Sequence, residues 1–296
     1  MPDAVPFGFL NIDKPHGITS HDVVSKVRRV FGIKKVGHAG TLDPLATGVL
    51  ILCVGGATRL SEYVMHQTKV YRATVKLGVT TTTYDAEGDI TEQKDATHIT
   101  QADVEPVLPR FTGDIEQYPP IYSAIKQGGK KLYELAREGK TVERKARNVR
   151  IDSLDIVEWR APEFVLDVTC SSGTYIRSLA YDIGEALAVG GYLSGLVRTR
   201  SGQFLLENGV TLETLQNSDI PANFLISPAQ ALTDYPSVIL TANDVTEIVH
   251  GRRATQAVPE DDSDALAFAY SENDEFIAIL KARHGKWYPH KVFSGA

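Results

Sequence analysis

The 296-residue chain is poor in cysteine and contains no long hydrophobic run. Its two cysteines, Cys53 and Cys170, each lie in an apolar stretch, which is typical of small buried side chains rather than of a disulfide. No CxxC pair or Cys/His cluster occurs, so a zinc site is excluded. The most apolar run, Gly48 to Ala57, is too short to span a bilayer, and the first residues do not resemble a secretory signal. We therefore expect a cytoplasmic protein with no membrane partner.

Basic residues are outnumbered by acidic ones, 31 to 37, and the resulting net charge of −6 argues at first against a nucleic-acid partner. The charges are distributed unevenly, however. Five basic residues and no acidic one lie between Lys26 and Lys35, and nine basic residues against three acidic ones lie between Lys126 and Arg150. Phosphate binding depends on such local patches and not on the net charge. The alternative is that each run is a solvated helix face.

Hydrophobic periodicity predicts an α+β protein, since strands and helices do not alternate strictly. We expect strands over residues 9–13, 49–54, 69–77, 148–159, 163–171 and 192–199. We expect helices over residues 21–30, 58–66, 102–111, 131–138 and 174–187. Three prolines near residues 221–236 indicate a domain boundary, after which short alternating segments at 238–240, 266–270 and 276–281 favour a small β-rich domain. We place the boundary between residues 1–232 and residues 233–296.

The loop from Gly37 to Gly48 is the strongest candidate for a functional site. Its three glycines allow the backbone to approach a ligand closely, and Pro44 forces Asp43 towards an extended conformation. Read alone, an Asp-Pro pair is more often an ordinary surface turn. The full twelve-residue string is far more specific than that pair.

Several spaced motifs, in a fixed order, resemble the TruB family of bacterial tRNA pseudouridine synthases. The resemblance covers most of residues 8–230. The motifs are Lys14-Pro15-x-Gly17-x-Thr19-Ser20, the loop 37–48, Lys69-x-Tyr71, Thr82-x-x-Asp85-x-x-Gly88, Pro119-Pro120-x-Tyr122-Ser123-Ala124, Lys130-Lys131-x-Tyr133, Ser172-Gly173-Thr174-Tyr175-Ile176-Arg177 and Leu196-x-Arg198-Thr199. The resemblance implies a pseudouridine synthase fold with a central mixed, mainly antiparallel sheet flanked by helices, followed by a small PUA-like β domain.

The resemblance also implies an activity, which is the isomerisation of uridine 55 in the TΨC loop of tRNA to pseudouridine after the base is flipped out. By position in the motifs, Asp43 is the catalytic nucleophile or base. Arg177 is its orienting arginine, and Tyr71 and Tyr175 line the base pocket. Leu196 and His38 are given supporting roles, although a strand leucine or a single histidine is more often structural. The reaction involves no redox step, so no cofactor or metal is expected.

The partner implied is the T-arm stem-loop of tRNA, bound by a monomer without a guide RNA. The basic segment at about 124–150 lies where the family inserts a thumb-like segment that clamps the RNA. Candidate phosphate contacts in it are Lys130, Lys131, Arg144, Lys145 and Arg147. Whether the PUA-like domain also contacts RNA is left open.

Two other functions compete with this reading. The chain could be an RNA chaperone for the tRNA elbow, with catalysis incidental, or a guide-RNA-dependent homologue that acts on ribosomal RNA. The intact basic segment argues against the latter, because a stand-alone enzyme must grip its own substrate. The chemical path also has three alternatives, in which Asp43 adds to C6, attacks C1′ or deprotonates C2′.

Overall fold

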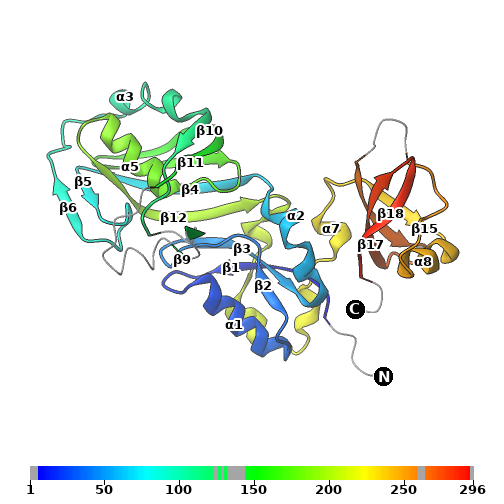
Figure 1. The fold of residues 1–296 in the computed structure, drawn as a ribbon. Helices are drawn as coiled ribbons and strands as arrows, with labels where there is room; N and C mark the ends of the chain where they lie inside the picture. The colour runs from blue at the N-terminus through cyan, green and yellow to red at the C-terminus, as the bar shows by residue number, and fades with distance from the viewer. Residues whose placement is uncertain (1–5, 123–125, 128–129, 132–143, 259–263, 294–296) are drawn as a thin grey trace.

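The structure, a computed structural model, describes residues 6–122, 126–127, 130–131, 144–258 and 264–293 (Figure 1). The expected helix over 131–138 and the glycines at 128, 129 and 139 therefore lie outside the described residues, apart from the backbone of Lys131. Across these ranges no helix is long and apolar enough to cross a membrane.

A ten-stranded mixed sheet forms the centre of the molecule and confirms the predicted α+β class (Figure 1). Its main path runs through β14 (Val210–Thr211), β1 (Gly8–Lys14), β3 (Thr47–Val54), β12 (Gly191–Ser201), β4 (Lys69–Leu77), β11 (Glu163–Cys170), β10 (Arg147–Arg160) and β7 (Gly113–Gln117). Beside this path, β2 (Val36–His38) pairs with β3, and β13 (Phe204–Leu205) pairs with β12. Only the β1–β14 and β3–β12 pairs are parallel, so the sheet is mainly antiparallel, as expected.

Strand β3 is buried on both faces, which explains its unbroken apolar sequence. Leu50, Leu52 and Val54 pack towards helix α1 (Ser20–Phe31), while Ile51 and Cys53 contribute to a second core on the other face.

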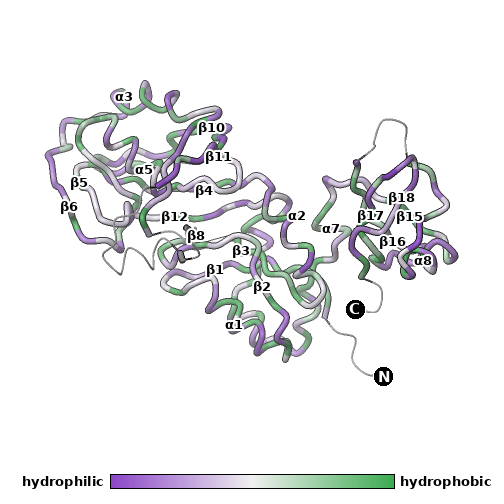
Figure 2. Tube along the Cα trace, viewed as in Figure 1, coloured by the Kyte–Doolittle hydropathy of each residue, from purple (hydrophilic) through white to green (hydrophobic). Residues whose placement is uncertain are grey.

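Helix α1 begins with a capping box and ends in a left-handed glycine. Thr19 and Asp22 exchange the capping hydrogen bonds, and Gly32 adopts φ 65° at the C-cap. Hydrophobic and hydrophilic stretches recur along the helix (Figure 2), and its buried valines lie three or four residues apart, which is the pattern of an amphipathic helix. Its buried valines therefore fix one side of the sheet near Asp43.

Helix α5 (Ile176–Ala186) covers the other half of the sheet. Leu179, Ala180 and Ile183 are buried against β4 and β11 in one hydrophobic cluster. The helix carries Arg177 in its first turn, so packing of its apolar face sets the position of that guanidinium.

Two predicted helices are broken. The segment at 102–111 forms α3 (Gln101–Val104) and a separate 3₁₀ turn, η2 (Leu108–Phe111), because Pro106 cannot donate a backbone hydrogen bond. The segment at 58–66 forms the 3₁₀ turn η1 (Gly55–Leu60) followed by α2 (Ser61–Met65).

The C-terminal residues form a separate four-stranded sheet with helix α8 (Ala242–Val249), as the β-rich prediction required. The strands are β15 (Ser237–Leu240), β16 (Leu266–Ser271), β17 (Phe276–Arg283) and β18 (Lys286–Val292). The last strand was not predicted, since Pro289 interrupts its pattern.

This small sheet is not an isolated module, because one of its faces shares an aromatic core with the large sheet. Phe268 meets Tyr63 edge-on, with ring centroids 5.4 Å apart. Phe9 of β1 belongs to the same cluster. At the rim, Arg59 donates to the carbonyl of Val292 at 2.6 Å and lies over the ring of Phe293. We keep the division at residues 232 and 233 as a proposal.

Gly48 allows a close approach between β3 and β12. Its φ is +91°, and a Cβ there would lie 2.4 Å from the carbonyl oxygen of Arg198.

We predict that Gly48→Ala lowers the free energy of unfolding by about 3 kcal/mol or more, because it adds a backbone clash to the strain of a positive φ. Gly113→Ala is the matched control, since Gly113 has φ +87° but open space around it. It should cost only about 1–2 kcal/mol. Equal losses in urea unfolding of the two variants would contradict the prediction.

Candidate active site

A cavity of about 350 Å³ brings together five of the six residues predicted for catalysis and uridine binding. Its lining includes Asp43, Tyr71, Tyr175, Arg177 and Leu196. These residues come from the loop before β3, from β4, from the start of α5 and from β12, so they are far apart in the sequence and meet only in the fold.

The Asp43 loop is fastened by the Lys14-Pro15-x-Gly17-x-Thr19-Ser20 motif. The buried ammonium of Lys14 donates to the carbonyls of Pro44 at 3.3 Å and Ala46 at 2.6 Å. The Ser20 hydroxyl accepts from the backbone N–H of Leu42 at 2.8 Å and donates to its carbonyl at 2.9 Å. The two motifs therefore act together, because the first holds the backbone on both sides of Asp43.

Burial lowers the pKa of Lys14 to about 8, and the nearby Asp43 carboxylate opposes this effect. Burial also lowers the pKa of Lys69 to about 8. The Lys69 ammonium donates a hydrogen bond to the carbonyl of Met65 at 2.6 Å. Both ammonium groups are thus surrounded by carbonyl oxygens and support the backbone around the cavity.

Arg177 joins the Asp43 loop to two other segments. Its Nη2 lies 2.9 Å from Oδ2 of Asp43 and donates to the carbonyl of Tyr122 at 3.0 Å. Its Nη1 lies 3.3 Å from Oδ2 of Asp85 and donates to the carbonyl of Thr83 at 3.2 Å. The side chain is only 8% exposed, so it is an almost buried cation held between two carboxylates. The predicted pairing with Asp43 is present.

Asp85 is a site residue that the sequence did not single out, although it occurs in the Thr82-x-x-Asp85-x-x-Gly88 motif. Its carboxylate is buried, and Oδ1 accepts from the Thr83 hydroxyl and from the backbone N–H of Glu87 at 3.0 Å. A buried carboxylate needs such donors and a cation partner. The spacing alone could not show that this cation is Arg177.

Arg198 also borders the cavity and was not assigned a role from the sequence. Its Nε donates to the carbonyl of Val49 at 2.7 Å, and Nη2 donates to that of Gly40 at 3.3 Å. Burial raises the pKa of Tyr71, while Arg198 acts in the opposite direction. The Tyr71 phenol is therefore neutral at ordinary pH and can act as a hydrogen-bond donor. Leu196 packs near Tyr71 in the same hydrophobic cluster.

Tyr175 lies in the cavity lining, whereas His38 lies outside it. The backbone of Tyr175 is bound by the Gln117 amide, which accepts from its N–H at 2.7 Å and donates to its carbonyl at 2.9 Å. Of the six residues predicted for catalysis and uridine binding, His38 alone is not part of the described cavity lining. It lies at the end of β2 with Nδ1 buried and without a hydrogen-bond partner in the described structure. Burial, and then the charge of Arg198, lowers its pKa.

The predicted phosphate contacts are described unevenly. Lys145 and Arg147 are exposed near the start of β10. Arg144 is half-buried and donates to the protein itself. For Lys130 and Lys131 the structure gives only the backbone of the short strand β9 (Lys130–Lys131), which pairs with β8 (Lys126–Gln127).

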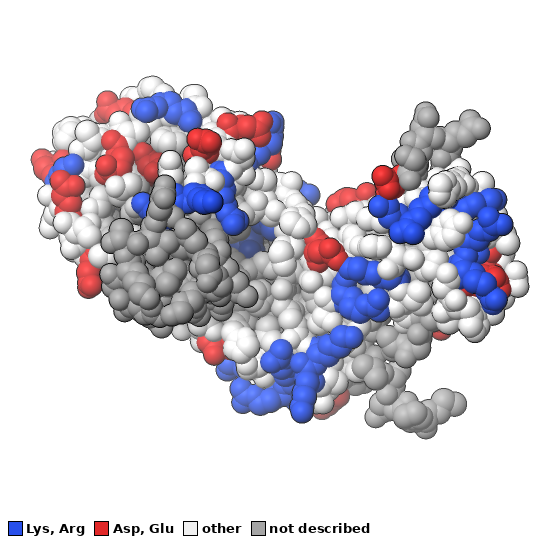
Figure 3. All heavy atoms as spheres, viewed as in Figure 1, with Lys and Arg blue, Asp and Glu red and all other residues white. Residues whose placement is uncertain are grey.

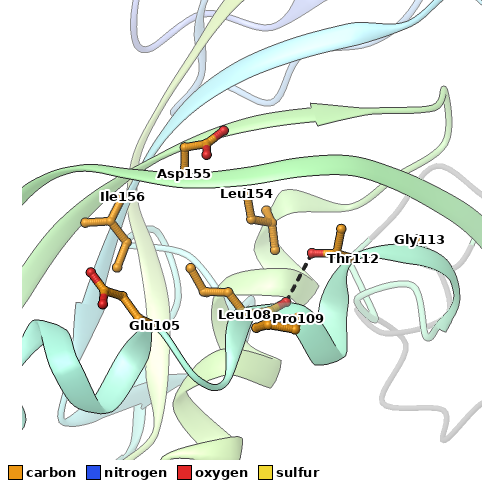
Figure 4. A pocket seen from close by; sticks show the side chains of 8 residues that line it. All are labelled: Glu105, Leu108, Pro109, Thr112, Gly113, Leu154, Asp155 and Ile156. Atoms are coloured by element: carbon orange, nitrogen blue, oxygen red, sulfur yellow. Dashed lines mark hydrogen bonds between the residues drawn. The ribbon is translucent and has the colours of Figure 1, made fainter.

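A second, larger hollow of about 700 Å³ carries no comparable chemistry. Leu108 and Pro109 of η2 face Leu154 and Ile156 of β10, while the side chain of Asp155 points to the other side of that strand (Figure 4). No lysine or arginine among the described residues lines it, so the smaller cavity is the better candidate. Within the described ranges, no group of three or more His, Cys, Asp or Glu residues could hold a metal ion.

Comparison with known families settles the class of the protein. A family model described as "TruB family pseudouridylate synthase (N terminal domain)" matches residues 28–176, and one described as "tRNA pseudouridylate synthase B C-terminal domain" matches residues 177–223. The chain belongs to the TruB family of pseudouridine synthases. A protein named tRNA pseudouridine synthase B from Pelotomaculum thermopropionicum is 45% identical over 97% of this chain and 94% of its own length. One of the same name from Symbiobacterium thermophilum is 50% identical over 82% of both chains.

Solved structures extend the likeness of this TruB-family chain to its whole length. An H/ACA RNP bound to a substrate RNA containing 2′-deoxyuridine contains a chain that matches with a TM-score of 0.75 and 26% identity. The match covers 98% of this chain and 86% of the other. A Cbf5-Nop10-Gar1 complex gives a TM-score of 0.74 at 27% identity, covering 99% and 90%. The pseudouridine synthase fold predicted from the motifs is confirmed, including the small C-terminal sheet.

Lys14 provides a pH-dependent test of how the Asp43 loop is held. We predict that Lys14→Met is less stable at pH 7 by about 1.5–3 kcal/mol, because the carbonyls of Pro44 and Ala46 lose a charged donor. The folded pKa of about 8 lies below the ordinary value of 10.5. Between these pH values the folded chain releases a proton that the unfolded chain retains, so the wild type should gain stability relative to the variant as pH rises. Parallel pH profiles in urea unfolding would show that the ammonium is not buried.

Proposed function

We propose that this TruB-family protein converts uridine 55 in the TΨC loop of tRNA to pseudouridine, with Asp43 as nucleophile or base. The observation that carries the proposal is the Asp43 carboxylate, paired with Arg177 at 2.9 Å beside a cavity that Tyr71 and Leu196 also line. The relatives named tRNA pseudouridine synthase B support tRNA as the substrate.

The geometry suits the reaction. Breaking the N1–C1′ bond and rejoining C5 to C1′ requires an ionised carboxylate next to the ribose and a pocket that retains the detached uracil. Arg177 orients the carboxylate and leaves it 43% exposed, so one face can meet a substrate. The neutral Tyr71 can stack on the base and donate a hydrogen bond. A uridine within a folded loop must be extracted to reach this cavity, at a cost of a few kcal/mol.

We further propose that the protein acts as a monomer and without a guide RNA. Its identity is 45–50% to the two relatives named as tRNA enzymes but only 26–27% to the chains in the H/ACA and Cbf5 complexes. Without a guide RNA, this chain must bind the T-arm with its own residues. Lys145 and Arg147, with Lys130 and Lys131, remain our candidates for phosphate contacts in the thumb-like segment at about 124–150.

A second basic surface is available for RNA phosphates. It consists of Lys26, Arg28, Arg29, Lys34 and Lys35, on α1 and the turn into β2, and we call it the α1 basic cluster. Lysine and arginine side chains gather at the lower edge of the molecule, where α1 lies (Figure 3). Arg29, Lys34 and Lys35 are exposed. Because a concentrated positive patch is unexpected on a chain of net charge −6, it favours a role in RNA binding.

Substitution of the nucleophile tests the reaction directly. Asp43→Asn should lower pseudouridine formation on an unmodified tRNA transcript by about 10³-fold or more, because the amide can neither attack nor accept a proton. Binding of the transcript should persist. The control is Asp155→Asn, which removes an exposed carboxylate at the other hollow. A rate near that of the wild type in Asp43→Asn would refute the proposed mechanism, and activity that requires an added guide RNA would refute the stand-alone role.

Salt dependence tests the α1 basic cluster. Each phosphate contact contributes roughly 0.7–0.9 to the slope of log affinity against log salt. Replacing Arg29, Lys34 and Lys35 with Gln should therefore reduce that slope by about 2–3. The control variant replaces three other basic residues with Gln and changes the net charge by the same amount. Each of them is paired with a glutamate: Lys76 with Glu163, Lys94 with Glu92 and Arg160 with Glu158. If both triple variants keep the wild-type slope, the cluster is only a solvated face.

A further inference from the structure

Arg144 directs its guanidinium into the protein rather than towards solvent. Nη1 donates to the hydroxyl of Tyr84 at 3.4 Å and to the carbonyl of Pro119 at 3.2 Å. The charge of Arg144 also acts on Asp182. Burial raises the pKa of that carboxyl group to about 6, and the positive charge of Arg144 opposes the rise. The Nη1 nitrogen of the guanidinium is therefore used within the protein and not offered to an RNA phosphate.

Tyr84 is the centre of this arrangement. Its ring stacks on that of Tyr181 of α5, with centroids 4.1 Å apart and an interplanar angle of 21°. Its φ is +64°, which is uncommon for a residue other than glycine and persists only where surrounding contacts hold it. Its backbone carbonyl accepts from the N–H of Leu193 at 3.0 Å, and the next residue, Asp85, makes a parallel bridge to Leu193. Tyr84 is thus fixed by its ring, its hydroxyl and its backbone.

The residues on either side of Tyr84 contact the catalytic arginine. The carbonyl of Thr83 and the carboxylate of Asp85 both lie within 3.3 Å of Nη1 of Arg177. The other terminal nitrogen of that guanidinium lies 2.9 Å from Asp43. Because the guanidinium is planar and rigid, a shift of Thr83 and Asp85 displaces the nitrogen that holds Asp43.

We propose that Arg144 and Tyr84 are positioning residues for the reaction. Arg144 and the Tyr181 ring fix Tyr84, Tyr84 fixes Thr83 and Asp85 against Arg177, and Arg177 fixes Asp43. Neither Arg144 nor Tyr84 lines the catalytic cavity, so both act through other residues. Misplacement of a reacting group by about 1 Å can cost 10²-fold in rate, so such support is kinetically significant. This proposal rests on the proposed function and places Arg144 outside the set of phosphate contacts.

The first experiment separates rate from affinity. Tyr84→Asn removes the ring, and asparagine tolerates a positive φ. The single-turnover rate at saturating protein should fall about 10-fold or more, while the Kd for a T-arm stem-loop should stay within about 2-fold. Arg144→Ala should lower the rate in the same way and leave the salt slope of binding unchanged. Arg110→Ala, an exposed arginine of η2, is the matched control and should change neither quantity.

The second experiment shows whether the effect passes through Asp85. Asp85→Asn alone should reduce the rate, and adding Tyr84→Asn in that background should lower it further by less than about 2-fold. Independent, multiplicative effects would overturn the proposal, because a general loss of stability would give that result. An increase in Kd with a smaller salt slope for Arg144→Ala, at an unchanged rate, would also overturn it and identify a phosphate contact.

One further variant keeps the test decisive. If Tyr84→Asn does not fold, Tyr84→Phe retains the stack on Tyr181 and loses only the hydroxyl that Arg144 contacts, so it should match Arg144→Ala in rate. A rate equal to that of the wild type would contradict the proposal. Failure of the proposed function is distinguishable, because the wild-type chain itself would then form no pseudouridine.

Discussion

The almost buried guanidinium of Arg177 is the interaction on which the site depends. A cation removed from water is tolerated only where carboxylates and carbonyls satisfy it, and here Asp43, Asp85, Thr83 and Tyr122 share that task. Three segments that are remote in sequence must therefore meet at one point. The Asp43 carboxylate is aligned as a consequence of neutralising this charge, so its placement follows from electrostatics as much as from the conformation of its own loop.

Much of the fold follows from local patterns. The apolar run of β3, the valines of α1 with their capping box, and the alternation in β4 each specify an element without reference to the rest of the chain. Two predictions failed where proline intervened, at Pro106 in a supposed helix and at Pro289 in a strand that was missed, whereas the helix expected at 58–66 broke into η1 and α2 without a proline. The order of strands was not predictable from these patterns, because it depends on contacts between segments.

Most of the residues that line the cavity were predictable from the motifs, but the ion pairs and hydrogen bonds that join them were not. The motifs placed Asp43, Arg177, Tyr71, Tyr175 and Leu196 in one pocket, and the structure brings them together. His38 was assigned near the substrate but lies outside the cavity lining. Asp85 was missed as a partner, since a Thr-x-x-Asp spacing is equally typical of a turn. The inward direction of Arg144 was also hidden, because a basic run in sequence does not reveal which side each residue faces.

The aromatic core shared by the two sheets limits how this architecture can be taken apart. Phe9, Tyr63 and Phe268 contribute to one cluster, with Phe276 packed against it, so the small sheet covers apolar surface that the large sheet cannot cover alone. Deleting the C-terminal residues would expose a hydrophobic patch beside β1 and β3, the strands that support the Asp43 loop. The two parts should melt as one cooperative unit, and an exchange of the C-terminal module with another protein would succeed only if the replacement supplied matching rings.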